Sequence, residues 1–166
     1  MSKKNKQSKI GERCLFAVKD IISSMKTAEI HIDAKEEEDS NYNSILPGLR
    51  ACLIKHPQSK ISSLICEAPQ NIDLVGSYLL DTICKPDLNM DLSIEIPDSI
   101  FTAKDFLNGR YYDKRTIYLS YIAKELSKKK YSNTINDIKI AYMKGDTRKP
   151  ILILYPSSKS SSNNKS

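Results

Sequence analysis

At 166 residues the chain is long enough for one domain that buries a core without disulfides or a structural metal, and its 28% charged and 40% hydrophobic content suits a soluble protein with flexible polar segments. No stretch approaches the roughly 18 apolar residues of a membrane span, and no apolar signal core follows the polar start, so we expect a soluble, intracellular protein. Residues 100–166 hold fourteen Lys and Arg against five Asp and Glu, an excess that favours contact with nucleic acid or simply gives a solvated surface.

The first part of the chain predicts one long helix and little other regular structure. Residues 1–9 are polar and basic and are expected to form a disordered lead. A helix at 8–26 is predicted by apolar residues at intervals of three and four, namely Ile10, Cys14, Val18, Ile21, Ile22 and Met25. Residues 36–43 are acidic and then polar, which indicates a loop, and 45–56 predict a short helix near a Pro-Gly pair.

Cysteine and histidine spacing argues against a metal site. His31 and His56 have no evident partners, so structural or surface roles are expected for them. The cysteines are far apart, without a CxxC pair or a histidine at zinc-finger spacing: Cys14, Cys52, Cys66 and Cys84. We expect reduced, mostly buried thiols.

The middle of the chain predicts a strand, a tight turn and a second strand. Residues 72–75 predict a short strand that stops at Gly76 and Ser77, after which Tyr78 begins a helical turn. Residues 90–96 alternate strictly between apolar and polar, which is the period of a strand with one buried face, and Pro97 ends that strand.

The second half predicts a long helix and then two strands. Thr102 and Asp105 have the spacing of a capping box, and apolar residues at three- and four-residue intervals extend the helix over 102–129. The apolar stretches at 138–143 and 151–155 are short enough for strands and are joined by a glycine-containing turn, which predicts an antiparallel pair.

The Gly-Ser turn and the acidic strand after it resemble the active-site arrangement of polymerase-beta-type nucleotidyltransferases. Gly76 would allow close backbone approach, and Ser77 would offer its hydroxyl and amide to a triphosphate. Two carboxylates two residues apart on a strand would share a face and hold two divalent ions. Here those positions are Asn89 and Asp91, so one of them is a neutral amide, a poorer ligand for a hard cation.

Other carboxylates do not complete such a site. Asp91 and Glu95 are four residues apart, roughly 13 Å along a strand, too far to share ions separated by about 3.5–4 Å. The predicted strands at 138–143 and 151–155 contain no Asp or Glu, so we expect the third ligand to be missing. The pattern indicates a vestigial nucleotide pocket with no catalytic residue and no metal, formed by Gly76, Ser77, Asn89 and Asp91.

Three segments carry a resemblance to a known family. They are VGSYLL at 75–80, KPDLNMDL at 85–92 and KDFLNGRYYDKRTIYL at 104–119. Together they resemble the opening domain of the Nrap (nucleolar RNA-associated protein) family, with the best match over 70–127.

This resemblance implies a nucleotidyltransferase-like fold in a nucleolar protein of the small-subunit processome, a preribosomal ribonucleoprotein. Such a protein takes part in rRNA processing with other assembly factors. The resemblance also implies that polymerase activity has been lost, with Asn89 part of the usual pattern. Family members are several times longer and repeat this unit, so the chain corresponds to a fragment, a split gene product or an incomplete gene model.

Basic and aromatic residues on the helix at 102–129 are candidates for binding RNA phosphates and stacking bases. They are Arg110, Tyr111, Lys114, Arg115, Lys128, Lys129 and Lys130, with Tyr118 nearby. Two alternatives stay open: the cations at 110–115 pair with Asp105 and Asp113, or the lysines at 128–130 complement the helix dipole.

These patterns predict an α/β (α+β) domain at 10–156, followed by a disordered tail at 157–166. A small mixed sheet, nucleotidyltransferase-like, is expected to pack against the helices at 8–26 and 102–129, with strands near 72–75, 90–96, 138–143 and 151–155.

The expected function is that of a non-catalytic RNA-associated scaffold in small-subunit ribosome biogenesis, in the nucleus and nucleolus. It would bind pre-ribosomal RNA and other assembly factors, and no cofactor or membrane is expected. The alternatives are an active metal-dependent nucleotidyltransferase that uses Asp91, or a protein-binding module without RNA contact.

Overall fold

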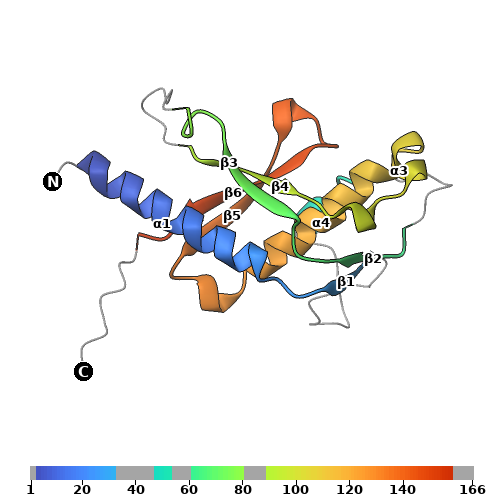
Figure 1. Cartoon of the computed structure of the whole chain (residues 1–166), viewed down its shortest axis with the longest axis horizontal. Coiled ribbons are helices and arrows are strands. Elements are labelled where there is room, and N and C mark those ends of the chain that lie inside the picture. Colours follow the sequence, from blue (N-terminus) through green and yellow to red (C-terminus); the bar gives the residue numbers. More distant parts are fainter. Residues whose placement is uncertain (1–2, 33–46, 54–60, 81–88, 159–166) are drawn as a thin grey trace.

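The computed structural model describes residues 3–32, 47–53, 61–80 and 89–158 (Figure 1). The helices and strands, in chain order, are α1 (Lys3–Ser23), β1 (Ala28–His31), α2 (Pro47–Arg50), β2 (Ser63–Cys66), β3 (Asn71–Val75), β4 (Asp91–Glu95), α3 (Ala103–Leu107), α4 (Arg110–Leu126), β5 (Ile135–Tyr142) and β6 (Pro150–Pro156).

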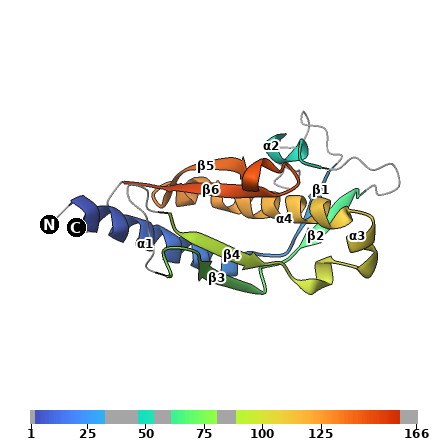
Figure 2. The ribbon, with the colours of Figure 1, turned by 90° about the horizontal axis from the view of Figure 1, so that it is seen from above.

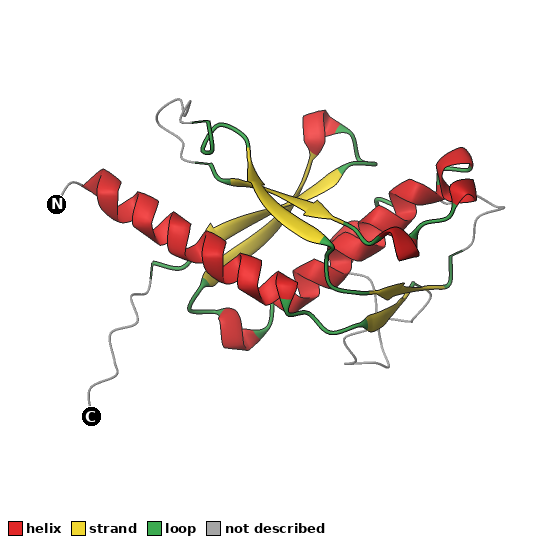
Figure 3. Cartoon of the chain, in the orientation of Figure 1, coloured by secondary structure: helices red, strands yellow, loops and turns green. Residues whose placement is uncertain are grey.

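The α/β class with small sheets packed against helices is confirmed, but the strands do not form one mixed sheet. The described strands make three separate two-stranded sheets, all antiparallel: β1 with β2, β3 with β4, and β5 with β6 (Figure 3). Figure 2 shows β5–β6 on one side of α4 and β3–β4 on the other. The β3–β4 pair and the β5–β6 pair therefore pack around a helix instead of joining edge to edge.

Helix α4 forms the centre of the core. Its apolar residues recur at helical spacing, and Ile117, Ile122 and Leu126 are each at most 2% exposed. Helix α1 packs against α4 and adds a second apolar stripe at the predicted positions, including Val18 and Ile22. Burying each such aliphatic side chain contributes about 1.5–3 kcal/mol, so the α1–α4 contact is a main source of stability.

The first helix is longer than expected at its start. It begins at Lys3 and ends at Ser23, so most of the lead predicted as disordered is helical. The predicted helix at 45–56 is limited to Pro47–Arg50 within the described residues, and the predicted loop at 36–43 lies outside them.

The predicted helix at 102–129 is two helices. Its capping box is confirmed, because the Asp105 carboxylate accepts hydrogen bonds from the Thr102 amide at 2.6 Å and from its hydroxyl at 2.9 Å. Gly109 then adopts a left-handed conformation (φ 77°), which ends α3, and the Asn108 side chain accepts a hydrogen bond from the Arg110 amide at 3.1 Å. Helix α4 ends at Leu126, before the lysine cluster.

Strand limits also differ from the expectation in one way that bears on the site. Strand β5 begins at Ile135 and not at 138, so it includes Asp137, which is exposed and paired with Tyr155 of β6. The statement that the later strands lack acidic residues is therefore wrong. The short strands β1 and β2 were not predicted at all.

The cysteines described are buried free thiols, as expected: Cys14, Cys52 and Cys66. Burial raises the pKa of the Cys66 thiol to about 12. Cys84 lies outside the described residues, as does His56, and His31 is exposed beside Glu29. None of the described helices is long and apolar enough to cross a membrane.

Candidate functional site: the glycine turn and the basic helix

The structure brings Gly76 and Asp91 together at one end of the β3–β4 hairpin. Val75 pairs with Asp91, so the turn that leaves β3 lies against the first residue of β4. Gly76 has a φ of 80°, and a Cβ atom there would lie only 2.5 Å from Oδ2 of Asp91. Both the backbone conformation and the close carboxylate require glycine at this position.

Ser77 and Asn89 complete the predicted pocket in sequence but have different surroundings. Ser77 is half-buried in a turn that is closed by a hydrogen bond from the Leu80 amide to the Gly76 carbonyl at 3.3 Å. Asn89 is exposed and precedes β4. The segment 81–88 between them lies outside the described residues, so a helix after the turn is not tested.

Helix α1 borders this turn, which the sequence did not indicate. The Tyr78 hydroxyl donates a hydrogen bond to Oε1 of Glu12 at 2.5 Å. This bond lowers the pKa of the Glu12 carboxyl and raises the pKa of Tyr78. A Cβ atom at Gly11 would lie 3.0 Å from Cε of Met90, so α1 also packs closely against the residue before β4.

Three carboxylates lie on the exposed face of the hairpin. Asp73 is opposite Ser93, between Asp91 and Glu95 of the neighbouring strand, and accepts a hydrogen bond from Asn71 at 2.7 Å. Asp73 was missed in the sequence, although its position two residues before Val75 predicts the same face. Across the described parts of the chain, no group of three or more Asp, Glu, His or Cys is arranged to hold a metal ion.

Lys114, one of the predicted RNA contacts, faces inward. Its Nζ atom lies 2.8 Å from Oδ2 of Asp105 and donates a hydrogen bond to the Ile100 carbonyl at 2.7 Å. The side chains of Lys114 and Asp105 are 13% and 1% exposed. Burial would raise the pKa of Asp105, but the hydrogen bonds from Lys114 and Thr102 outweigh it and hold that pKa below its usual value. Lys114 therefore ties α4 to the start of α3.

The aromatic candidates, like Lys114, make contacts with other residues of the fold. Tyr118 is buried and donates a hydrogen bond to the Glu67 carbonyl at 2.8 Å, so it cannot stack on a base. Tyr111 is half-buried and stacks on Phe106, with ring centroids 5.1 Å apart. Phe106 itself is 63% exposed. Phe106, which the sequence argument did not select, is therefore the more exposed ring of this stacked pair.

The remaining cations lie at the two ends of α4. Arg110 and Arg115 near its start are both half-buried. Beyond its end, Lys128 forms an ion pair with Glu125, and Lys130 lies 3.5 Å from the same carboxylate and over the Tyr131 ring. Lys129, between them, is exposed.

Fold and turn together define the class of this protein: an α/β domain of small antiparallel sheets on two helices, in which a glycine turn abuts the first carboxylate of the next strand. A family model described as Nrap protein domain 1 matches residues 26–166. The chain belongs to the Nrap family. The match extends well beyond the segment 70–127 that first carried the resemblance.

Curated relatives are nucleolar proteins. The chain is 36% identical over 124 residues to nucleolar protein 6 of Mus musculus, covering 75% of the chain and 10% of that protein. It is 28% identical over 155 residues to nucleolar protein 6 of Homo sapiens, covering 93% and 13%. With U3 small nucleolar RNA-associated protein 22 of Schizosaccharomyces pombe it shares 49% identity over 71 residues, covering 42% and 6%. The chain thus spans about a tenth of these proteins, and their names indicate the nucleolar location that the resemblance implied.

Proposed function

We propose that this chain is a non-catalytic, RNA-associated scaffold unit in small-subunit ribosome biogenesis in the nucleolus, in contact with pre-ribosomal RNA and other assembly factors. Membership of the Nrap family is the single observation that carries this proposal. A relative named for association with U3 small nucleolar RNA supports the RNA part.

The arrangement around Gly76 supports the non-catalytic part. Asn89, two residues before Asp91 and just ahead of β4, stands where the resemblance to nucleotidyltransferases would place a carboxylate metal ligand. Asp137, the acidic residue of β5, belongs to a different two-stranded sheet from Asp91.

Nucleotide transfer separates this proposal from an active enzyme. The full chain is incubated with labelled NTPs, Mg²⁺ or Mn²⁺ and an RNA primer, in parallel with Asp91→Ala and with Asp98→Ala, an exposed carboxylate outside the hairpin. We expect no primer extension by any of the three. Extension by the unmodified chain and Asp98→Ala, but not by Asp91→Ala, would establish the enzyme instead.

RNA association is tested by fluorescence anisotropy with a labelled single-stranded RNA at several salt concentrations. We expect binding that weakens as salt rises, because lysines and arginines release counterions from phosphates. Failure of the full chain to bind RNA at low salt would favour a protein-binding module.

A further inference from the structure

A row of aromatic side chains runs from α3 across the start of α4 to the turn between β5 and β6. The Phe106 ring stacks on Tyr111 with centroids 5.1 Å apart, and Tyr111 packs against the edge of Tyr112 at 5.6 Å. The Arg148 guanidinium, from the β5–β6 turn, lies 5.5 Å from the centre of the Tyr112 ring. These four residues form an aromatic strip that joins three separate segments of the chain.

One end of the aromatic strip is an exposed ring. Phe106 is 63% exposed, although a phenylalanine side chain gains free energy when it is buried. The ring is already ordered by its contact with Tyr111, so a flat ligand that stacks on Phe106 extends the row without the cost of ordering a new side chain. Nucleotide bases are such ligands, because every base has a face that can stack.

The other end of the aromatic strip is an ordered guanidinium. Asp146 accepts hydrogen bonds from Nε and Nη2 of Arg148, each at 3.0 Å, which hold the guanidinium in one orientation over Tyr112. Arginine has more N–H donors than these two bonds use, so its Nη1 group remains to bind a phosphate oxygen.

The segments that carry the aromatic strip have a positive net charge. Residues 98–115 and 143–149 contain seven lysines and arginines against four aspartates, an excess of three positive charges. Two of these aspartates, Asp105 and Asp113, are buried and do not lie on the surface. A positive surface with stacked rings is complementary to nucleic acid, which combines anionic phosphates with flat bases.

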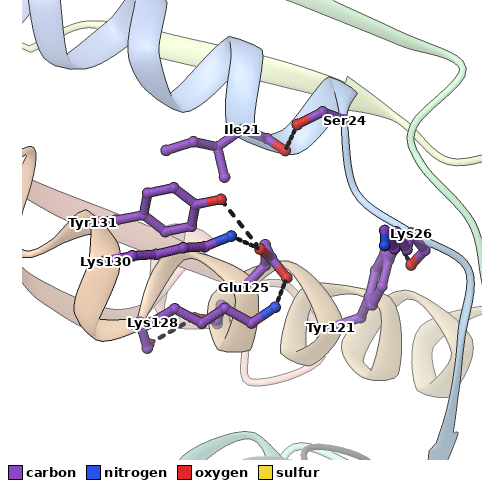
Figure 4. Close-up of polar contacts among 10 residues, drawn as sticks. Ile21, Ser24, Lys26, Tyr121, Glu125, Lys128, Lys130 and Tyr131 are labelled. Carbon is purple, nitrogen blue, oxygen red and sulfur yellow. Dashed lines mark hydrogen bonds and ion pairs between the residues drawn. The ribbon is translucent and has the colours of Figure 1, made fainter.

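Arg110, which precedes Tyr111, adds to this positive surface. It is half-buried, and its side chain makes no hydrogen bond or ion pair with the parts of the chain that the structure describes. The cations beyond the far end of α4 differ, because Glu125 forms ion pairs with Lys128 and Lys130 (Figure 4). We therefore expect an anionic ligand to favour the start of α4 over its end.

From this arrangement we propose that the aromatic strip binds single-stranded RNA, with a base stacked on Phe106 and a phosphate held by Arg148. The inference rests on the proposed RNA association and names the surface that makes the contact. A single strand suits the strip, because the bases of a duplex are stacked on one another and do not reach a protein ring. The phosphate contact makes part of the affinity depend on salt, whereas the stacking contact does not.

Single substitutions in the full chain separate the ring from the charge, with matched controls on α1. Phe106→Leu keeps an apolar side chain but removes the ring, and its control is Phe16→Leu, at a phenylalanine that is 64% exposed. Arg148→Gln removes the guanidinium, and its control is Arg13→Gln, at an exposed arginine. Phe106→Tyr keeps a stacking ring. Circular dichroism and thermal melts first establish that every variant is folded at the assay temperature.

Affinity for a labelled uridine dodecamer is then measured over a salt series. Phe106→Leu should lose roughly fivefold or more in affinity with an unchanged slope of log K against log salt, because stacking releases no counterions. Arg148→Gln should make that slope shallower by about 0.7, the value for one phosphate contact to a single strand. Phe106→Tyr and both α1 controls should stay within about twofold of the unmodified chain.

The outcomes distinguish the strip from RNA association in general. Equal losses in the strip variants and their α1 controls, or an unchanged affinity in Phe106→Leu, would overturn the strip and leave RNA association standing. If the unmodified chain binds no RNA, the proposed RNA association and this inference both fail.

Ultraviolet cross-linking of the unmodified chain to the same RNA gives a second measurement that does not depend on any variant. Peptide mass spectrometry should find cross-links at Phe106 or Tyr111, the stacked pair of the strip. Cross-links confined to peptides from other parts of the chain would overturn the proposal.

Discussion

Replacement of Lys114 by alanine is predicted to destabilise the fold instead of selectively weakening RNA binding. The change leaves the Asp105 carboxylate buried without its cation and removes the hydrogen bond to the Ile100 carbonyl. Two hydrogen bonds from Thr102 to the carboxylate would remain, so some stabilisation of the charge survives. The substitution therefore weakens the contact between α3 and α4.

Truncation of one partner in a buried ion pair costs about 3–5 kcal/mol. The Lys114 side chain is 13% exposed and Thr102 still donates to Asp105, so we expect the lower end, about 3 kcal/mol. For a domain of this size 1 kcal/mol shifts the Tm by roughly 2–4 °C, which predicts a Tm lower by about 6–12 °C. Lys104→Ala, an exposed lysine on α3, is the control and should change stability by less than about 0.5 kcal/mol.

Urea unfolding followed by circular dichroism measures both variants, and RNA affinity is measured at a temperature where both are folded. If Lys114→Ala lowers the free energy of unfolding by no more than about 1 kcal/mol beyond the control, the structural role of the Lys114–Asp105 ion pair is refuted. Equal RNA affinities are expected for the two variants. A selective loss in Lys114→Ala would restore Lys114 as an RNA contact.

Three further predictions follow from the geometry. Gly76→Ala should lower the free energy of unfolding by about 1–3 kcal/mol, because the φ of 80° is strained for alanine and the added Cβ atom would lie 2.5 Å from Oδ2 of Asp91. Gly109→Ala, where no atom lies within 4 Å of the added Cβ, should lower it by less in the same urea titration. Because the pKa of Asp105 is lowered in the folded chain, its carboxylate stabilises the fold fully above the pKa of a free carboxyl group, near about pH 4, and this contribution is lost as the pH falls through the lowered pKa. An unfolding free energy that stays constant from pH 5 to 2 in the unmodified chain would contradict this prediction. Cys66, with its pKa raised to about 12, should resist iodoacetamide at about pH 8 until urea is added, and native-state labelling detected by peptide mass spectrometry would argue against its burial.

Short sequence patterns correctly predicted those helices and strands that depend mainly on residues close together in the sequence. The apolar stripe of α1 and the strict alternation of β4 each follow from one repeating period, and both occur where expected. The break at Gly109 was also present in the sequence, as an Asn-Gly pair, but the continuous apolar spacing on either side concealed it. Strands β1 and β2 have only four residues each and are stabilised by pairing with each other across more than thirty residues, which no short window reveals.

Side-chain roles on α4 could not be predicted in the same way, because charge in a sequence does not reveal burial. Lys114 and Arg115 are neighbours with the same charge, yet Lys114 is fixed to Asp105 of α3 while Arg115 lies on the next position around the helix. Ion pairing with Asp105 was one of the alternatives left open, and only the packing of α3 on α4 decides for it.

The turn at Gly76 illustrates why the presence of a sequence motif does not by itself imply the reaction associated with that motif. Gly76 is required by its positive φ and by the Asp91 carboxylate, so a steric demand of the hairpin explains its presence without any nucleotide.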